Sequence, residues 1–262
     1  LQDVDRANNL VELFLTRAEA KGDAPVLGRK IAGEWTTMSW AEVADQVCLL
    51  AESLRKLGLN EGDRVALVAE NRPEWCISDL AIMAAGCISV PTYITNTERD
   101  HAHILDNSGA RAVIVSTEKL LGPVVGAIGR TGIVDHVIGI DDLHRQQSPG
   151  FAYHNWSDMM QGDAAAARSE VKERIAKIER EDTACLIYTS GTGGAPRGVK
   201  QHHGAILCNI AGAGEIVITD FGVDNERFLS FLPLSHAYEH TAGQYLPIAL
   251  EGEIFYSEGL EK

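Results

Sequence analysis

The sequence contains few cysteines, and their arrangement argues against a disulfide framework. There are five, an odd number, and no two of them form a C-x-x-C pair. Cys48, Cys87, Cys185 and Cys208 lie in apolar stretches, where a free cysteine behaves as a small hydrophobic residue. Because free thiols persist in reducing compartments, we expect buried free thiols and a cytoplasmic location.

Positive charge is also scarce. The formal net charge is −14, and no basic stripe interrupts the acidic background. Proteins that bind nucleic acids usually carry such a stripe, so we expect no nucleic-acid partner. The negative charge also means that a phosphate-bearing ligand must be held by a local feature that works against the field of the whole protein.

Long hydrophobic runs are missing as well. The longest strongly apolar stretch, residues 81–91, is too short to cross a bilayer. Residues 1–10 lack the basic and apolar segments of a signal peptide. We therefore expect no transmembrane segment, which leaves peripheral contact with a membrane open.

The overall composition is that of a folded globular protein, with 45 % hydrophobic and 23 % charged residues. Short apolar stretches alternate with helical patterns, which predicts an α/β fold, a layered αβα arrangement around a largely parallel sheet. Ser39 and Glu42 form a capping box before the first clear helical pattern. Helices are expected at residues 40–57, 73–86, 97–108 and 164–180, and strands at residues 64–69, 87–90, 112–115, 133–140 and 184–188.

The sharpest feature is a loop rich in glycine and hydroxyl groups that follows the predicted strand at residues 184–188. Glycines let backbone N–H groups approach an anion closely, and Arg197 supplies a fixed charge with forked geometry. The Walker pattern fails because Val199 follows Gly198, and the dinucleotide pattern fails because Pro196 replaces its last glycine. A surface loop with glycines for turn geometry alone is the alternative. We predict phosphate binding by Thr189, Ser190, Gly191, Thr192, Gly193, Gly194 and Arg197.

Residues 188–198 resemble the phosphate-loop motif of the acyl- and aryl-adenylating superfamily, whose usual form is Y-T-S-G-T-T-G-x-P-K-G. Two positions depart from that form, because Gly193 replaces the second Thr and Arg197 replaces the Lys. The first change removes a hydroxyl donor and loosens the loop, and the second keeps the charge but alters its shape. The matching residues are Tyr188, Thr189, Ser190, Gly191, Thr192, Gly194, Pro196 and Gly198.

A second stretch, residues 228–241, resembles the L-P-L-x-H motif of the same superfamily, in which an apolar strand delivers a histidine, here His236. This stretch and residues 62–75 and 256–260 are most similar to long-chain fatty acyl-CoA synthetases. The resemblance begins near residue 39 and implies that residues 1–262 are the N-terminal portion of the large AMP-binding domain. It leaves a subdomain change near residues 181–185 open and places the small C-terminal domain outside this chain.

The same stretch also fits a zinc motif, because His236-x-x-Glu239-His240 matches H-x-x-E-H. On a helix the two histidines would share a face, with Glu239 as the general base. A third protein ligand would be needed, and Pro233 favours a strand end and a turn at this point. A zinc metallopeptidase therefore stays as an alternative.

Two other histidine pairs are interpreted as helix-surface or helix-entry residues rather than ligands. They are His101 with His103, and His202 with His203.

The resemblance implies a two-step reaction that uses ATP, Mg²⁺ and coenzyme A, with a fatty acid as substrate. The fatty carboxylate would attack the α-phosphate of ATP, and the thiol of coenzyme A would then attack the acyl-adenylate. His236 is the expected catalytic residue and would steer the carboxylate, while residues 246–250 would line or back the acyl pocket. The residues that hold Mg²⁺ are left unassigned.

The resemblance also implies segments for adenine, ribose and a catalytic Lys that are expected beyond Lys262. We therefore expect residues 1–262 to be inactive alone, and a non-catalytic nucleotide-binding scaffold is the alternative. If the rest of the domain normally packs against an apolar face of residues 1–262, that exposed face would favour self-association.

Overall fold

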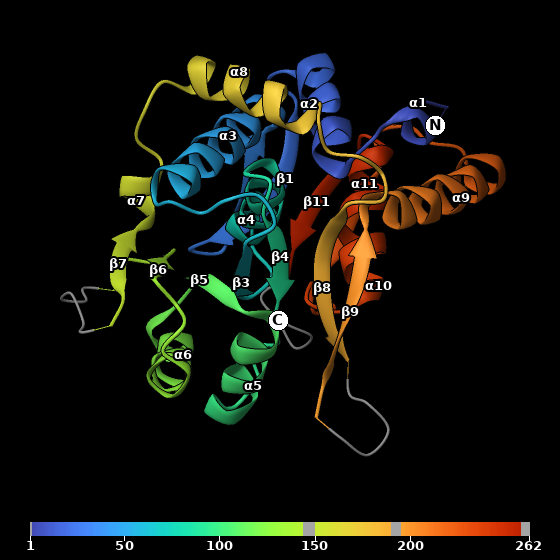
Figure 1. The fold of residues 1–262 in the computed structure, drawn as a ribbon. Coiled ribbons are helices and arrows are strands. Elements are labelled where there is room, and N and C mark those ends of the chain that lie inside the picture. Colours follow the sequence, from blue (N-terminus) through green and yellow to red (C-terminus); the bar gives the residue numbers. More distant parts are fainter. Residues whose placement is uncertain (1, 144–149, 190–194, 258–262) are drawn as a thin grey trace.

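The computed structural model describes residues 2–143, 150–189 and 195–257, which form two β-sheets surrounded by helices (Figure 1). The larger sheet has the strand order β7-β6-β5-β3-β4-β8-β9, and the smaller has the order β10-β11-β1-β2. The strands are β1 (Pro25–Ile31), β2 (Glu34–Ser39), β3 (Arg64–Val68), β4 (Ile88–Pro91), β5 (Ala110–Val115), β6 (His136–Gly139), β7 (Ala152–Asn155), β8 (Thr183–Thr189), β9 (Arg197–His202), β10 (Arg227–Ser230) and β11 (Glu253–Tyr256).

Helices cover both faces of the larger sheet. The helices of the described residues are α1 (Gln2–Arg6), α2 (Leu10–Lys21), α3 (Trp40–Lys56), α4 (Pro73–Ala84), α5 (Glu98–Ser108), α6 (Glu118–Thr131), α7 (Trp156–Met159), α8 (Ala164–Ile175), α9 (His203–Phe221), α10 (Ala237–Glu239) and α11 (Leu246–Ala249), with a π-helical turn η1 (His240–Tyr245) before α11. In Figure 1, α3 and α8 lie together on one side, whereas α5 and α6 lie toward the lower edge.

Alternating side chains of the central strand β3 enter two separate cores. Val65 and Leu67 pack with α2, α3, α4 and α8, whereas Ala66 and Val68 pack with α5 and α6. Successive side chains of a strand point to opposite faces, so a strand that is covered on both sides must be apolar throughout. The larger sheet is parallel except for the pairing of β8 with β9. The predicted αβα arrangement around a largely parallel sheet is therefore confirmed.

Helix α4 is enclosed by the fold and links the two sheets. Every residue of α4 except Glu74 is buried, and the helix contacts β3 and β4 of the larger sheet and β1 of the smaller one. A helix that is apolar on all sides belongs in an interior. The apolar stretch at residues 81–91 therefore reflects burial between sheets.

Local capping signals predicted helix starts well, but a tertiary contact shortens one helix. The capping box of Ser39 with Glu42 is present, and Thr97 caps α5 as expected. The helix expected over residues 164–180 ends at Ile175. The side-chain amide of Asn9 donates to the carbonyl oxygens of Ile175 at 3.0 Å and Ile178 at 3.3 Å, which satisfies groups at the helix end.

The cysteine prediction is right for Cys48, Cys87 and Cys185 but wrong for Cys208, which is exposed. Cys208 follows the buried Leu207 on α9, and one residue is about 100° of rotation on an α-helix. The apolar neighbourhood in the sequence therefore did not place its side chain inside.

Helix α9 bears on the expectation that the chain has no transmembrane segment. By length and composition it is the one helix of the described residues that is long and apolar enough to cross a membrane. Of the apolar 18-residue stretch of α9 that meets this criterion, 33 % is buried. Core helices of soluble proteins pass the same test, so the observation is weak. Its buried side chains fall between His203 and Gly214, and the apolar Ile216 and Phe221 beyond them are exposed.

Candidate active site

The C-terminal ends of strands from both sheets meet at one pocket. In Figure 1 the arrowheads of β4, β8 and β11 point toward the lower edge of the view. A pocket of about 230 Å³ lies among the residues that follow β3, β4, β10 and β11. Ligands of open α/β sheets bind outside the carboxyl ends of the strands. The pocket is lined by Ala69, Glu70, Asn71, Tyr93, Ile94, Thr95, Phe231, Pro233, Leu234, Ser235 and Ser257.

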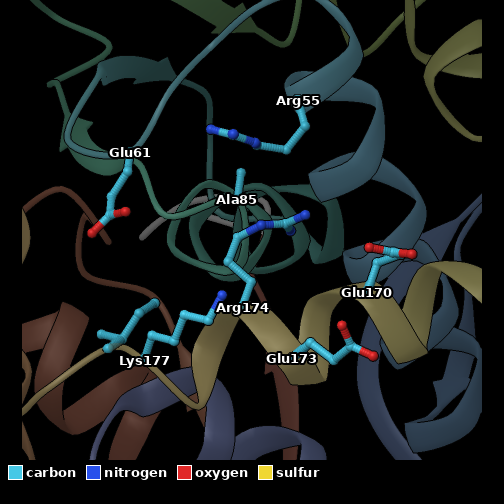
Figure 2. Close-up of a pocket in the computed structure, with 8 residues that line it drawn as sticks. Arg55, Glu61, Ala85, Glu170, Glu173, Arg174 and Lys177 are labelled. Carbon is cyan, nitrogen blue, oxygen red and sulfur yellow. The ribbon is translucent and has the colours of Figure 1, made fainter.

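A second, more highly charged pocket lies at the opposite ends of the strands and is a weaker candidate. Figure 2 shows Arg55, Arg174 and Lys177 among acidic side chains, near residues that precede β3 and β4. Arg174 donates to the carboxylate of Glu52 at 2.7 Å and to the carbonyl of Ala84 at 3.0 Å, so its charge already has partners. We therefore place the candidate site at the C-terminal edge.

The predicted phosphate loop connects β8 to β9. Thr189 and Arg197 are register partners at the tip of this antiparallel pair, and both are exposed. Ser190, Gly191, Thr192, Gly193 and Gly194 lie outside the described residues. Within the described residues, Arg197 forms no ion pair. Arg197 is exposed at the end of β9, opposite the carboxyl end of β8, and a guanidinium has the forked donor geometry that suits phosphate.

Helix α5 holds the two strands of this hairpin next to the loop. The hydroxyl of Tyr188 donates to Oδ1 of Asn107 at 2.7 Å, and Nε2 of His103 lies 2.8 Å from the carbonyl oxygen of Pro196. Gly198 pairs with Tyr188, and a Cβ atom at Gly198 would lie 2.9 Å from the tyrosine ring. The glycine is needed here for close approach.

The interpretation of the histidine pairs as helix-surface or helix-entry residues is only partly right. His202 caps α9, and its Nδ1 accepts from the N–H of Ala205 at 3.0 Å. His101 and His203 are buried, and burial lowers the pKa of each to about 4. Both face the interior, whereas His103 binds the hairpin.

The structure places the predicted catalytic residue His236 at the N-cap of α10, directly after Ser235 of the pocket wall. Its side chain is exposed and does not line the pocket, and its Nδ1 accepts from the N–H of Tyr238 at 3.2 Å. The predicted acyl-pocket residues 246–250 are buried in the main core and do not line this pocket.

The residues of the zinc motif point in different directions. His236 lies before the helix and is exposed, whereas His240 is fully buried and its Nε2 lies 2.9 Å from Oδ2 of Asp79. Glu239 accepts from the hydroxyl of Ser230 at 2.8 Å. Across the described residues, no group of three or more His, Cys, Asp and Glu side chains is arranged to hold a metal ion. An i, i+4 zinc pair needs both histidines on one helix face, and the extended backbone at His236 prevents that here.

Two residues at the centre of this region were missed by sequence reasoning. Asn71, in the pocket wall, binds the segment before His236, and Asp79, on α4, binds the turn that follows it. A signal for Asp79 was a charged residue within residues 75–84, a stretch of the helix that is otherwise mostly apolar.

Comparison with known protein families shows which family the chain belongs to. The model of the family described as AMP-binding enzyme matches residues 14–262. The chain belongs to this family. Among curated relatives of the AMP-binding family, the chain is similar to a long-chain-fatty-acid–CoA ligase of Mycobacterium tuberculosis, with 30 % identity over 233 residues, covering 89 % of this chain and 37 % of the relative.

A further curated relative and two solved structures give the same picture. A long-chain-fatty-acid–CoA ligase of Xenopus laevis is 27 % identical over 98 % of this chain and 35 % of its own length. The chain thus spans little more than a third of these relatives. The anthranilate CoA ligase AuaEII in complex with anthranoyl-AMP has the same fold, with a TM-score of 0.80 and 20 % identity over 96 % of this chain and 45 % of that one. The inhibitor-bound N-terminal domain of FACL13 from Mycobacterium tuberculosis gives a TM-score of 0.78 with 22 % identity over 97 % of this chain and 58 % of that one.

Proposed function

We propose that this chain is the N-terminal portion of an ATP-dependent fatty acid–CoA ligase. The observation that carries the proposal is the convergence of the carboxyl ends of β3, β4, β10 and β11 on one pocket. The carboxyl end of β8 in the β8–β9 hairpin lies at the same end of the larger sheet, because β8 pairs in parallel with β4. The family match over residues 14–262 and the fatty-acid ligases among the relatives support the same conclusion.

The proposed reaction has two steps. In the first, a carboxylate oxygen of the fatty acid bonds to the α-phosphorus of ATP, and pyrophosphate leaves. In the second, the thiol of coenzyme A attacks the acyl carbonyl, loses its proton and displaces AMP. In such transfers a protein mainly positions the reactants and stabilises charge.

The residues of this chain take the following parts. Arg197 and the loop from Thr189 to Gly194 bind the β- and γ-phosphates and release them as pyrophosphate. His236 orients the carboxylate next to the α-phosphate. When bound, Mg²⁺ would neutralise phosphate charge, and it typically keeps water and substrate phosphates among its ligands.

Residues 1–262 alone are proposed to lack ligase activity. The match covers 37 % and 35 % of the two relatives, and nearly two thirds of their length lies outside it. A nucleotide-binding scaffold without turnover is the alternative, and ATP binding without fatty-acid-dependent exchange in the full gene product would support it.

The phosphate role of Arg197 gives a direct test. We expect Arg197→Ala, in the full gene product, to weaken fatty-acid-dependent exchange of pyrophosphate into ATP by roughly 10- to 100-fold, because hydrogen bonds to charged groups contribute about 1.5–3 kcal/mol. Arg197→Lys keeps the charge and should lose less. Arg99→Ala, on the exposed first turn of α5, is the control. Equal exchange by the Arg197→Ala and Arg99→Ala proteins would remove Arg197 from the site.

A further inference from the structure

The segment that carries His236 has little regular structure of its own. It joins the end of β10 at Ser230 to the start of α10 at Ala237. The N–H of His236 donates to the carbonyl oxygen of Pro233 at 2.9 Å and closes one turn. Pro233 has no N–H to donate. The shape of the segment therefore depends on side chains from elsewhere.

Asn71 supplies the first set of contacts. Its Nδ2 donates to Oγ of Ser230 at 3.1 Å and to the carbonyl oxygen of Leu232 at 2.6 Å. Its Oδ1 accepts from the N–H of Leu234 at 3.1 Å. The side-chain amide of Asn71 thus donates two hydrogen bonds and accepts one, and its three partners all lie in the segment before His236. A neighbouring strand would satisfy the segment in a similar way.

Asp79 supplies the second set, on the other side of His236. Its Oδ2 accepts from Nε2 of His240 at 2.9 Å, from Nε2 of Gln244 at 3.1 Å and from the hydroxyl of Tyr245 at 2.6 Å. Burial on its own would raise the pKa of Asp79, but the interaction with His240 and the hydrogen bonds from Ser89 and Tyr245 hold it below the usual value. The carboxylate therefore holds three side chains of the six-residue η1 turn.

The two sets of contacts are joined. The hydroxyl of Ser230, which accepts from Asn71, donates to Glu239 at 2.8 Å, and Glu239 directly precedes His240. The N–H of His240 donates to the carbonyl oxygen of His236 at 2.9 Å. The backbone of His236 is held on both sides, although its exposed imidazole has only the local contact with Tyr238.

We propose that Asn71 and Asp79 are positioning residues that fix the direction of the His236 side chain for the adenylation step, with Ser230 and Glu239 as the link between them. This inference rests on the proposed ligase function. A buried carboxylate is costly in an apolar helix unless it is well paired. Its presence on α4, among Cys76, Leu80 and Met83, fits a requirement for one orientation of the η1 turn.

The test uses Asn71→Asp, which keeps the size of the side chain but turns the donor that faces Leu232 and Ser230 into an acceptor. In the full gene product, kcat for fatty-acid-dependent pyrophosphate exchange should fall by on the order of 10- to 100-fold, the cost of a displacement near 1 Å. The KM for ATP should change little. In a His236→Ala background the same substitution should have almost no further effect on kcat, since residues that act through one another are not additive.

A second measurement does not depend on activity. In residues 1–262, Asn71→Asp should accelerate hydrogen exchange at the amides of Leu234 and His240, while Asn8→Ala, an exposed control, should not. Asp79→Asn should show the same kinetics as Asn71→Asp, a lower kcat with little change in the KM for ATP. If the Asp79→Asn protein does not fold, Ser230→Ala takes its place in the test. The positioning role would be overturned if Asn71→Asp lowered kcat equally in the wild-type and His236→Ala backgrounds. Unchanged hydrogen exchange at the amide of Leu234 would overturn it as well. A wild-type protein without fatty-acid-dependent exchange would instead overturn the ligase function and this inference with it.

Discussion

His203 is a residue whose chemistry depends on its partner across the fold. It is the first residue of α9 and is buried against α2, where its Nδ1 accepts the N–H of Leu10 at 3.3 Å. A nitrogen that accepts a hydrogen bond carries no proton, so the folded state needs the neutral imidazole. Burial, the main cause, lowers the pKa of His203 from 6.5 to about 4.

This shift predicts a loss of stability in mild acid. The unfolded chain takes up the proton near pH 6.5 and the folded chain near pH 4, so the free energy of unfolding falls as the pH drops through that window. Between pH 7 and pH 4.5 the contribution of His203 is about 2–3 kcal/mol. His203→Asn keeps an acceptor that does not titrate, and its urea unfolding should show a flatter pH dependence.

The control for this prediction is Asn8→Ala, which changes an exposed side chain that does not titrate. It should keep the slope of the wild-type pH curve, because the substitution neither adds nor removes a titratable group. Parallel curves for His203→Asn and the wild type would contradict the assignment of the acid sensitivity to His203. His101, whose pKa burial also lowers to about 4, is the next residue to test in that case.

Among the secondary-structure elements, the β8–β9 hairpin is the one whose packing most directly affects the phosphate loop. Tyr188 and Pro196 lie on either side of the loop and both contact α5, through Asn107 and His103. Gly198 lets the Tyr188 ring lie against the facing strand. The hairpin is therefore fixed by side chains that come from outside its own sequence.

Gly198→Ala tests this close approach. The added Cβ would lie 2.9 Å from the ring of Tyr188, which is held in turn by Asn107, so the contact must shift. Overpacking of this kind typically costs 1–3 kcal/mol, and we expect a loss of about that size in the free energy of unfolding of residues 1–262, measured by urea denaturation.

Gly129→Ala is the matched control, because Gly129 lies inside α6 and a Cβ there meets no atom within 4 Å. This substitution should stabilise the chain by about 0.5–1 kcal/mol through helix propensity. If Gly198→Ala were as stable as Gly129→Ala, the hairpin would be free to move away from Tyr188, and the account of its packing would be wrong.

The elements also show how far sequence reasoning reached. Helix starts at Ser39 and Thr97 were predicted correctly because capping depends on residues within one turn. The strands β3, β4 and β8 were predicted from short apolar stretches. The smaller sheet was not recognised as a separate unit, since Leu27 pairs with Ile254 and no local pattern encodes that pairing.

The candidate site divides in the same way. The loop and His236 were found because a short contiguous motif carries them, although Ser190 to Gly194 lie outside the described residues. Asn71 and Asp79 were missed because their partners lie about 160 residues further along the chain. Contacts over such separations depend on the fold, and a single sequence does not show them.

At the scale of the whole molecule, α4 and strands of both sheets share the main core, and residues that follow strands of both sheets line the same pocket. Apolar side chains remain exposed at the end of α9 and along β10, notably Ile216, Phe221 and Leu229 at 61 %, 83 % and 58 % of their full exposure. Exposed apolar groups of this kind are typical of surfaces that bind other protein. Self-association and the docking of further chain both stay predictions.

The central proposal is that the full gene product joins a fatty acid to coenzyme A through an acyl-adenylate. The most direct measurement is mass spectrometry of acyl-CoA and AMP formed from palmitate, ATP, Mg²⁺ and coenzyme A, by the full gene product and by residues 1–262 alone. We predict equal amounts of palmitoyl-CoA and AMP from the full product, only when all four components are present, and neither from residues 1–262. Absence of any fatty acyl-CoA from the full product, tested across short, medium and long chains, would contradict the ligase assignment.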